Sequence, residues 1–178
     1  GWAKAADLIG ETTAEIPAMI AMIGGLIDTV VLHDDGWRFL MIGRCIERLQ
    51  FLCESVAGLL RSQGLGPGDR MAIMLPNVLA FPVLFFGALQ VGAVVVPMNP
   101  LFKTREIQYY LEDSGAVMLW GVPSEEAEAA TQAVGVPFHA LGADGLAPHL
   151  TASPGPVTEA AERDPQDDAV ILYTSGTT

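Results

Sequence analysis

Between residues 70 and 140, short apolar runs alternate with longer segments of helical character, and this alternation constrains the fold more than any other feature. Each run has the length of a strand, and all but the last, which ends in a histidine, are apolar throughout rather than at every second residue. Strands of this kind are buried on both faces, which is typical of a parallel sheet with helices on both faces. We therefore predict an α/β fold with strands at residues 71–75, 93–97, 116–120 and 136–139, and helices at residues 77–91, 104–114 and 124–133.

The residues before this region are predicted to form an all-helical N-terminal segment. Asp34 and Asp35 can cap a long helix that begins near Gly36. The glycines and the proline of residues 64–69 end this helix. Its apolar side chains keep one broad face at helical spacing, and they include Leu40, Ile46, Leu49, Leu52 and Val56.

An uncharged stretch over residues 16–27 raises the question of a membrane helix. It is about twelve residues long, whereas a helix needs about 20 residues to cross a bilayer. We therefore predict a buried helix there and no transmembrane segment.

The charge of the chain argues against a nucleic-acid partner. The net charge is −12, and residues 112–168 carry eleven acidic residues against the single base Arg163. Such a surface repels the phosphates of nucleic acids.

The cysteines and histidines do not predict a metal site. Cys45 and Cys53 are eight residues apart in the predicted helix, about 12 Å along its axis, which is too far for a disulfide. Two free thiols fit a reducing, cytoplasmic location. His33, His139 and His149 have no acidic or cysteine residues arranged around them, so we expect them to be surface or core histidines.

The last residues of the sequence indicate an anion site. Residues 169–173 are a fifth apolar run of strand character, predicted to return to the sheet after a surface connection over residues 141–167. A strand that opens into a loop rich in glycine and hydroxyl groups presents backbone N–H groups and hydroxyls to an anion, usually a phosphate. The predicted nucleotide-binding residues are Thr174, Ser175, Gly176, Thr177 and Thr178, and no catalytic residue is predicted.

Four ordered segments resemble the adenylate-forming, or AMP-binding, superfamily. They are residues 66–77 (GPGDRMAIMLPN), 87–100 (GALQVGAVVVPMNP), 106–116 (EIQYYLEDSGA) and 173–178 (YTSGTT). Within that superfamily the chain is most similar to fatty-acid–CoA ligases, over about residues 54–178. The resemblance implies that residues 173–178 are the first half of the superfamily's phosphate loop.

The resemblance also implies a reaction in two steps. A fatty acid carboxylate attacks the α-phosphate of Mg²⁺-bound ATP, which gives an acyl-adenylate and pyrophosphate, and coenzyme A then takes the acyl group. Residues 174–178 would hold the β- and γ-phosphates. For the complete enzyme the implied cofactors are ATP, Mg²⁺ and coenzyme A, and the implied partner is a small carboxylic acid, a fatty acid.

The sequence departs from the family after Thr178. In the family this loop continues with glycine, proline and a lysine, and magnesium-binding and adenine-binding segments and a mobile C-terminal domain follow. We therefore expect a ligase fragment that is inactive as this chain alone. A free carboxylate at Thr178 would repel phosphate, so we also expect no ATP binding in calorimetry at about millimolar nucleotide.

The sequence also departs from the family before about residue 50. The strand and the helix start that the family has there are missing, and residues 35–48 (DGWRFLMIGRCIER) instead resemble the helical alpha-E domain family. We therefore divide the chain into a helical segment of separate resemblance, residues 1–53, and an incomplete N-terminal ligase subdomain, residues 54–178. A natural fusion, an assembled sequence and a misread gene would each explain the junction.

Two further expectations follow from this division. The alternative function is a non-catalytic helical interaction module carried by residues 1–50. An incomplete sheet has unpaired edges, so we expect the chain to self-associate.

Overall fold

A computed structural model describes residues 22, 25, 35–151 and 153–174 of the chain. The chain divides into two compact units, Gly1–Ile46 and Glu47–Thr178. In the first unit Met22 and Gly25 are helical, and the other residues of the predicted 16–27 helix lie outside the described residues. The long helix α2 (Asp35–Ser62) begins in the first unit and ends in the second. Within the described part of the chain, no helix is both long enough and apolar enough to cross a membrane.

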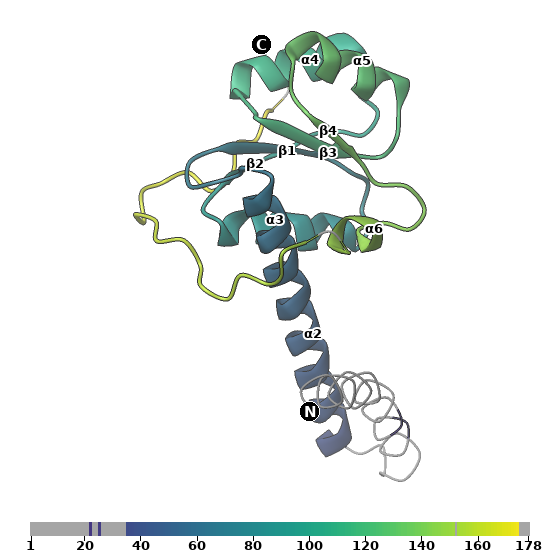
Figure 1. The fold of residues 1–178 in the computed structure, drawn as a ribbon, viewed down its shortest axis with the longest axis vertical. Helices are drawn as coiled ribbons and strands as arrows, with labels where there is room; N and C mark the ends of the chain where they lie inside the picture. Colours follow the sequence, from purple (N-terminus) through teal and green to yellow (C-terminus); the bar gives the residue numbers. More distant parts are fainter. Residues whose placement is uncertain (1–21, 23–24, 26–34, 152, 175–178) are drawn as a thin grey trace, which may run out of the picture. The chain divides into compact units, whose positions relative to one another are not determined.

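The second unit is built on a four-stranded parallel sheet with the strand order β2-β1-β3-β4 (Figure 1). In the register, Ala72 of the central strand lies opposite Val96 on one side and Leu119 on the other. Three of the strands are buried along nearly their whole length, so the predicted parallel sheet is confirmed. The strands are β1 (Arg70–Met74), β2 (Val94–Pro97), β3 (Met118–Gly121) and β4 (Phe138–Ala140).

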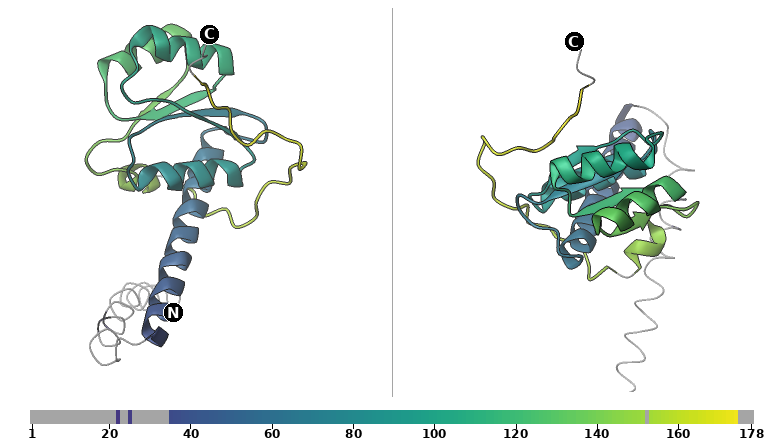
Figure 2. Two further views of the ribbon diagram at one scale, coloured as in Figure 1. Left: turned by 180° about the vertical axis from the view of Figure 1, so that it is seen from behind. Right: turned by 90° about the horizontal axis from the view of Figure 1, so that it is seen from above.

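Helices cover both faces of this sheet, as predicted (Figures 1 and 2). On one face α4 (Thr104–Ser114) and α5 (Glu125–Val134) pack through Ile107, Leu111, Ala127 and Ala130. The other face is covered by α3 (Ala80–Gln90), the C-terminal part of α2 and the short helix α6 (Ala147–Leu150). Gly87 lets α3 approach α2 closely, because a Cβ at this position would lie 2.7 Å from Cγ1 of Val56.

Local sequence explains where these helices begin and end. Gly115 has a φ of +62°, a conformation that favours glycine, and α4 ends directly before it. The Ser124 hydroxyl accepts a hydrogen bond from the Ala127 N–H (3.1 Å) and so caps α5. α3 begins at Ala80 rather than at the predicted Asn77, because the chain first turns, with the Val78 N–H bonded to the Pro76 carbonyl (2.8 Å).

The prediction of a full fifth strand over residues 169–173 is wrong. Only Val170 pairs with the sheet, through an isolated parallel bridge to Val95. The Val95 N–H donates to the Ala169 carbonyl (3.0 Å), and the Ile171 N–H donates to the Val95 carbonyl (2.9 Å). No further pairing with β2 follows Ile171 among the described residues, and the Tyr173 side chain contacts α4 instead.

The connection that leads to this bridge lies over α2 and α3. The Val157 N–H donates to the Glu54 carbonyl of α2 (2.9 Å), and the Gln90 side chain of α3 donates to the Val157 carbonyl (2.6 Å). The Ala161 N–H then donates to the Gln90 carbonyl (2.8 Å). The predicted surface connection over residues 141–167 is therefore hydrogen-bonded to two helices. It also contains the helix α6, which was not predicted from the sequence. In Figure 2 this connection is the yellow part of the chain, which passes the edge of the sheet and continues toward α4.

Candidate functional site

The segment that leads into the predicted phosphate loop runs beside β2 for a short distance only. Val170 pairs in parallel with Val95, and two residues after Ile171 the Tyr173 side chain bonds to Asp113 of α4. Thr174 is exposed. Ser175, Gly176, Thr177 and Thr178 lie outside the described residues, so the five-residue site stays a prediction.

The residues just before Thr174 alternate between the core and solvent. Ile171 and Tyr173 pack against the apolar cluster between the sheet and α4 and α5, whereas Leu172 is 70% exposed. This alternation is that of extended backbone, although only Val170 pairs with β2. One face of the segment is therefore fixed to the core.

Tyr173 is held by its side chain. Its hydroxyl donates a hydrogen bond to Oδ2 of Asp113, at 2.6 Å. Its ring lies 4.4 Å from the ring of Tyr110, at an interplanar angle of 64°. Burial, followed by the hydrogen bond and charge of Asp113, raises the pKa of Tyr173 to about 12, so the hydroxyl remains a donor throughout the neutral range.

Sequence reasoning did not identify Asp113 and Tyr110 as neighbours of the predicted loop. They are three residues apart in α4, and this spacing places both on one face of a helix. That signal predicts a shared face, but it does not show which segment the face meets.

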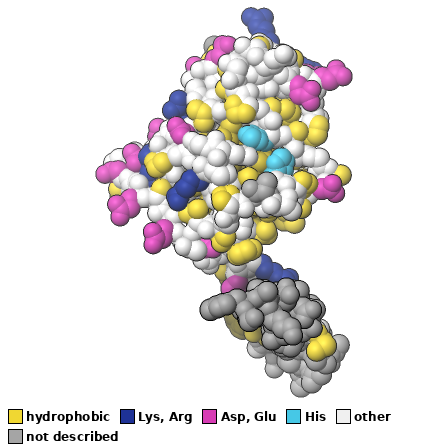
Figure 3. All heavy atoms as spheres, viewed as in Figure 1, with side chains coloured by type: hydrophobic (Ala, Val, Ile, Leu, Met, Phe, Trp, Pro, Cys, Tyr) yellow, Lys and Arg dark blue, Asp and Glu magenta, His cyan; other side chains and the backbone are white. Residues whose placement is uncertain are grey.

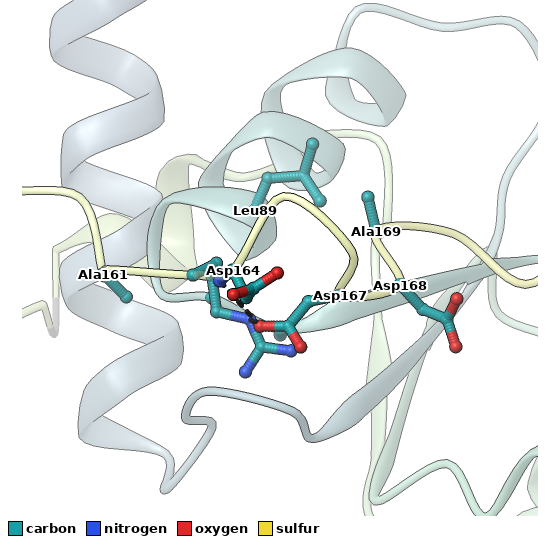
Figure 4. A pocket seen from close by; sticks show the side chains of 9 residues that line it. Leu89, Ala161, Asp164, Asp167, Asp168 and Ala169 are labelled. Atoms are coloured by element: carbon teal, nitrogen blue, oxygen red, sulfur yellow. Dashed lines mark hydrogen bonds and ion pairs between the residues drawn. The ribbon is translucent and has the colours of Figure 1, made fainter.

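A cavity of about 320 Å³ lies beside the amino end of β2 (Figure 4). The Arg163 guanidinium in its wall is paired with the Asp167 carboxylate, with Nε and Oδ2 3.0 Å apart. Three carboxylates against one guanidinium make this cavity unfavourable for the phosphates of a nucleotide. The lining residues include Leu89, Gly92, Ala161, Asp164, Asp167 and Asp168.

Two histidines pack around Trp120 on the face of the sheet that α6 covers. The His139 ring is stacked on the Trp120 ring, with centroids 4.5 Å apart, and the His149 ring meets it edge-on at 4.9 Å. Burial lowers the pKa of His139, and the charge of His149 acts in the same direction. Figure 3 shows two histidine side chains next to each other among hydrophobic side chains. His139 and His149 therefore contribute to packing, and His33 lies outside the described residues.

The described residues offer no cluster of metal ligands. No group of three or more His, Cys, Asp or Glu side chains in this part of the chain is placed to hold a metal ion. Cys45 is exposed and Cys53 is buried, and both are free thiols, in agreement with the prediction of no disulfide.

Family models match both parts of the chain. The model of the AMP-binding enzymes matches residues 47–178, which is most of the sequence. The chain belongs to the AMP-binding enzyme family. The resemblance carried by the four sequence segments is therefore confirmed. The Alpha-E model, of a predicted alpha-helical domain with a conserved ER motif, matches residues 2–81 and overlaps the first match.

The proteins to which this AMP-binding chain is similar include a fatty-acid–CoA ligase. The long-chain-fatty-acid–CoA ligase FadD13 of Mycobacterium tuberculosis is 35% identical over 136 residues, which are 74% of this chain and 27% of that ligase. The solved N-terminal domain of FACL13 from the same organism is 32% identical with a TM-score of 0.64, over 72% of this chain and 34% of that one. ATP-bound MatB from Rhodopseudomonas palustris is 30% identical with a TM-score of 0.66, over 73% of this chain and 27% of that one.

The match is confined to the N-terminal part of these ligases. The chain spans 27% of the length of the curated relatives that it matches over most of its own length.

Proposed function

We propose that residues 54–178 form the first part of an ATP-dependent fatty-acid–CoA ligase, preceded by a helical segment over residues 1–53. Residues 174–178 are its loop for the β- and γ-phosphates of ATP. One observation carries the proposal: the match to the AMP-binding enzyme family extends over residues 47–178 and so includes this loop.

The reaction we propose for the complete ligase is adenylation followed by thioester formation. A carboxylate oxygen of the fatty acid attacks the α-phosphorus of ATP, and pyrophosphate leaves. The thiolate of coenzyme A then attacks the acyl carbon, and AMP leaves. Mg²⁺ would neutralise phosphate charge during the first step.

The part that we assign to this chain is to position the departing phosphates. Backbone N–H groups and hydroxyls of residues 174–178 would donate hydrogen bonds to the phosphate oxygens, with Gly176 at the point of closest approach. Such groups accelerate the reaction by fixing the nucleotide in line with the attacking carboxylate.

A hybrid ligase tests this function. Residues 1–178 replace the matched N-terminal part of the FadD13 ligase and are joined to the remainder of that enzyme. We expect AMP and pyrophosphate to form in a manner that depends on a long-chain fatty acid, and acyl-CoA to form once coenzyme A is added. A folded hybrid that makes no AMP from ATP contradicts the proposal.

Loop variants of the hybrid identify the nucleotide-binding residues. We expect Ser175→Ala and Gly176→Val each to lower kcat/KM for ATP by about tenfold or more. Gly66→Ala is the glycine control, because a Cβ at Gly66 has its nearest neighbour at 3.7 Å and the residue lies in the turn before β1. An equal decrease of kcat/KM for ATP in Gly66→Ala and Gly176→Val would contradict the assignment of residues 174–178 as the phosphate loop.

The Alpha-E match over residues 2–81 supports a second function. In this alternative, residues 1–50 are a non-catalytic helical interaction module. Deletion of residues 1–46 from the hybrid separates the two possibilities. Unchanged ligase activity would support a helical module whose function is separate from the ligase. Loss of activity in a folded protein would show that the ligase requires the helical segment.

We also propose a cytoplasmic location and self-association. The free thiols Cys45 and Cys53 fit a reducing compartment. Among the described strands, β4 is paired on one side only, by β3, which leaves a backbone edge for a second chain. Size-exclusion chromatography should show species larger than the 18.8 kDa monomer. A sharp monomer peak with a cooperative thermal transition would contradict self-association.

A further inference from the structure

The segment that leads into the predicted phosphate loop is tied to the C-terminal end of α4 by one side chain. The hydroxyl of Tyr173, the residue directly before Thr174, donates to the Asp113 carboxylate at 2.6 Å. Hydrogen bonds from a hydroxyl to a carboxylate at such distances are among the stronger ones in proteins. The Tyr110 ring, 4.4 Å away, limits the orientations that the Tyr173 ring can adopt.

The end of α4 that carries Asp113 is itself fixed to the central strand. The Arg70 guanidinium donates from Nε to the Ser114 carbonyl (2.9 Å) and from Nη2 to the Gly115 carbonyl (2.8 Å). These carbonyls belong to the last turn of α4 and to its cap, where a cation also interacts favourably with the helix dipole. Leu111, one turn earlier on the helix, is buried in the core. These contacts fix the backbone of the helix end that carries Asp113, whose carboxylate is exposed.

We propose that Tyr173 and Asp113 are positioning residues of the phosphate loop, which set the position of the backbone where it enters the loop at Thr174. This inference rests on the proposed function, because the loop itself is assigned there. Neither side chain has to touch the nucleotide. Their bond holds the entry to the loop in place before ATP arrives, so less conformational entropy is lost when the phosphates bind.

This role differs in a measurable way from a contribution to folding alone. A hydrogen bond that only stabilises the fold changes the melting temperature and leaves the kinetics for ATP unchanged. A positioning bond changes the order of the Thr174 backbone and the KM for ATP, while the KM for the fatty acid stays the same.

The first test measures backbone order in the chain of residues 1–178. We expect Tyr173→Phe, which removes only the hydroxyl, to lower the NMR order parameter of the Thr174 amide, and Asp113→Ala to have the same effect. Asp113→Asn keeps a carbonyl oxygen that can accept the bond, and it should restore most of the order. Tyr109→Phe removes a hydroxyl from the neighbouring residue of α4 and is the matched control. An unchanged order parameter at Thr174 in Tyr173→Phe and Asp113→Ala would overturn the proposal.

The second test uses the FadD13 hybrid. We expect Tyr173→Phe and Asp113→Ala each to raise the KM for ATP by about tenfold, and the double variant to be no worse than either single one. Equal KM values in an active hybrid, or a lowered melting temperature as the only change, would overturn the positioning role. An inactive parent hybrid would contradict the proposed function, while the order parameter of Thr174 would still decide the positioning role.

Discussion

The two ends of α2 carry the same apolar pattern but have different surroundings. Along this helix, apolar side chains recur every three or four residues, which defines one continuous stripe. Ile42, Ile46 and Leu49 in the first half of the stripe are 54%, 59% and 46% exposed. Cys53, Val56 and Leu60 in the second half are 8%, 0% and 0% exposed.

The difference lies in what packs against the second half. α3 meets Val56 at Gly87, and the connection after α6 is bonded to the Glu54 carbonyl. Leu60 is part of the core cluster that includes residues of β1 and β3. Periodicity therefore shows which side chains can be buried together, but other parts of the chain decide which of them are.

The largest effect is expected where the stripe is buried. Leu60→Ala removes a fully buried side chain, so the free energy of unfolding should fall by about 2–5 kcal/mol. Urea unfolding of the chain measures the change. Leu49→Ala, at a half-exposed position of the same stripe, is the control and should cost about 0.5 kcal/mol or less. Equal decreases in the free energy of unfolding in the two variants would show that the two ends of the stripe do not differ in burial in solution.

The close contact at Gly87 should give the next largest effect. Gly87→Ala places a methyl group 2.7 Å from Cγ1 of Val56 and should destabilise the protein by about 1–3 kcal/mol through overpacking. Val56→Ala removes the clashing group, so the double variant should lose less stability than the sum of the two single variants. Additive losses of unfolding free energy, measured by the same urea unfolding, would show that the strain of Gly87→Ala does not come from contact with Val56.

Lowering the pH should destabilise the buried end of α2 more than the exposed end, and this effect should be smaller than those of the two substitutions above. The pKa of His139 is lowered by burial and by His149, and its neighbour Trp120 belongs to the same core cluster as Val56 and Leu60. In the unfolded chain His139 takes up a proton near pH 6.5. The stability contributed by its neutral ring is therefore complete above about pH 6.5 and falls as the pH decreases toward the lower pKa of the folded state.

Thermal unfolding and amide exchange detect this loss of stability. Between about pH 8 and pH 5.5, the melting temperature should fall more in the parent protein than in His139→Phe. Exchange corrected for the intrinsic rate should rise at residues 56–60 and change little at residues 42–46. An identical pH dependence of the melting temperature in the variant would exclude His139 as the cause.

The smallest effect is expected at the exposed end. Ile46→Gln should change the free energy of unfolding by about 0.5 kcal/mol or less, because the side chain is more than half exposed. A shift of the size-exclusion profile toward the monomer in this variant would show that the exposed stripe, rather than the edge of β4, holds copies together.

The sequence predicted most of the fold because its strongest signals are local. The apolar runs fixed all four strands to within a few residues, and Gly115 and Ser124 marked helix limits through their own backbone and side-chain chemistry. The strand over residues 169–173 was overestimated because an apolar run predicts contact with the core, and Ile171 and Tyr173 pack against the core without pairing with a strand.

The candidate site was less accessible to sequence reasoning. The hydroxyls and glycine of residues 174–178 indicate phosphate chemistry by composition and order alone. The anchor at Tyr173 depends on a contact with Asp113, sixty residues earlier in the chain, and on the Arg70 bonds that fix the end of α4. Contacts between distant segments depend on the packing of the whole sheet, which no local pattern encodes.

The strand order β2-β1-β3-β4 has a consequence for synthesis on the ribosome. β1 emerges first, and β2 and β3 then add to its two sides. β4 adds outside β3, and finally Val170 adds outside β2. Each strand that emerges can pair with a strand already made, and no strand has to be inserted between two others. Vectorial translation and sheet growth therefore proceed in the same order, which shortens the time for which an unpaired apolar strand is open to aggregation.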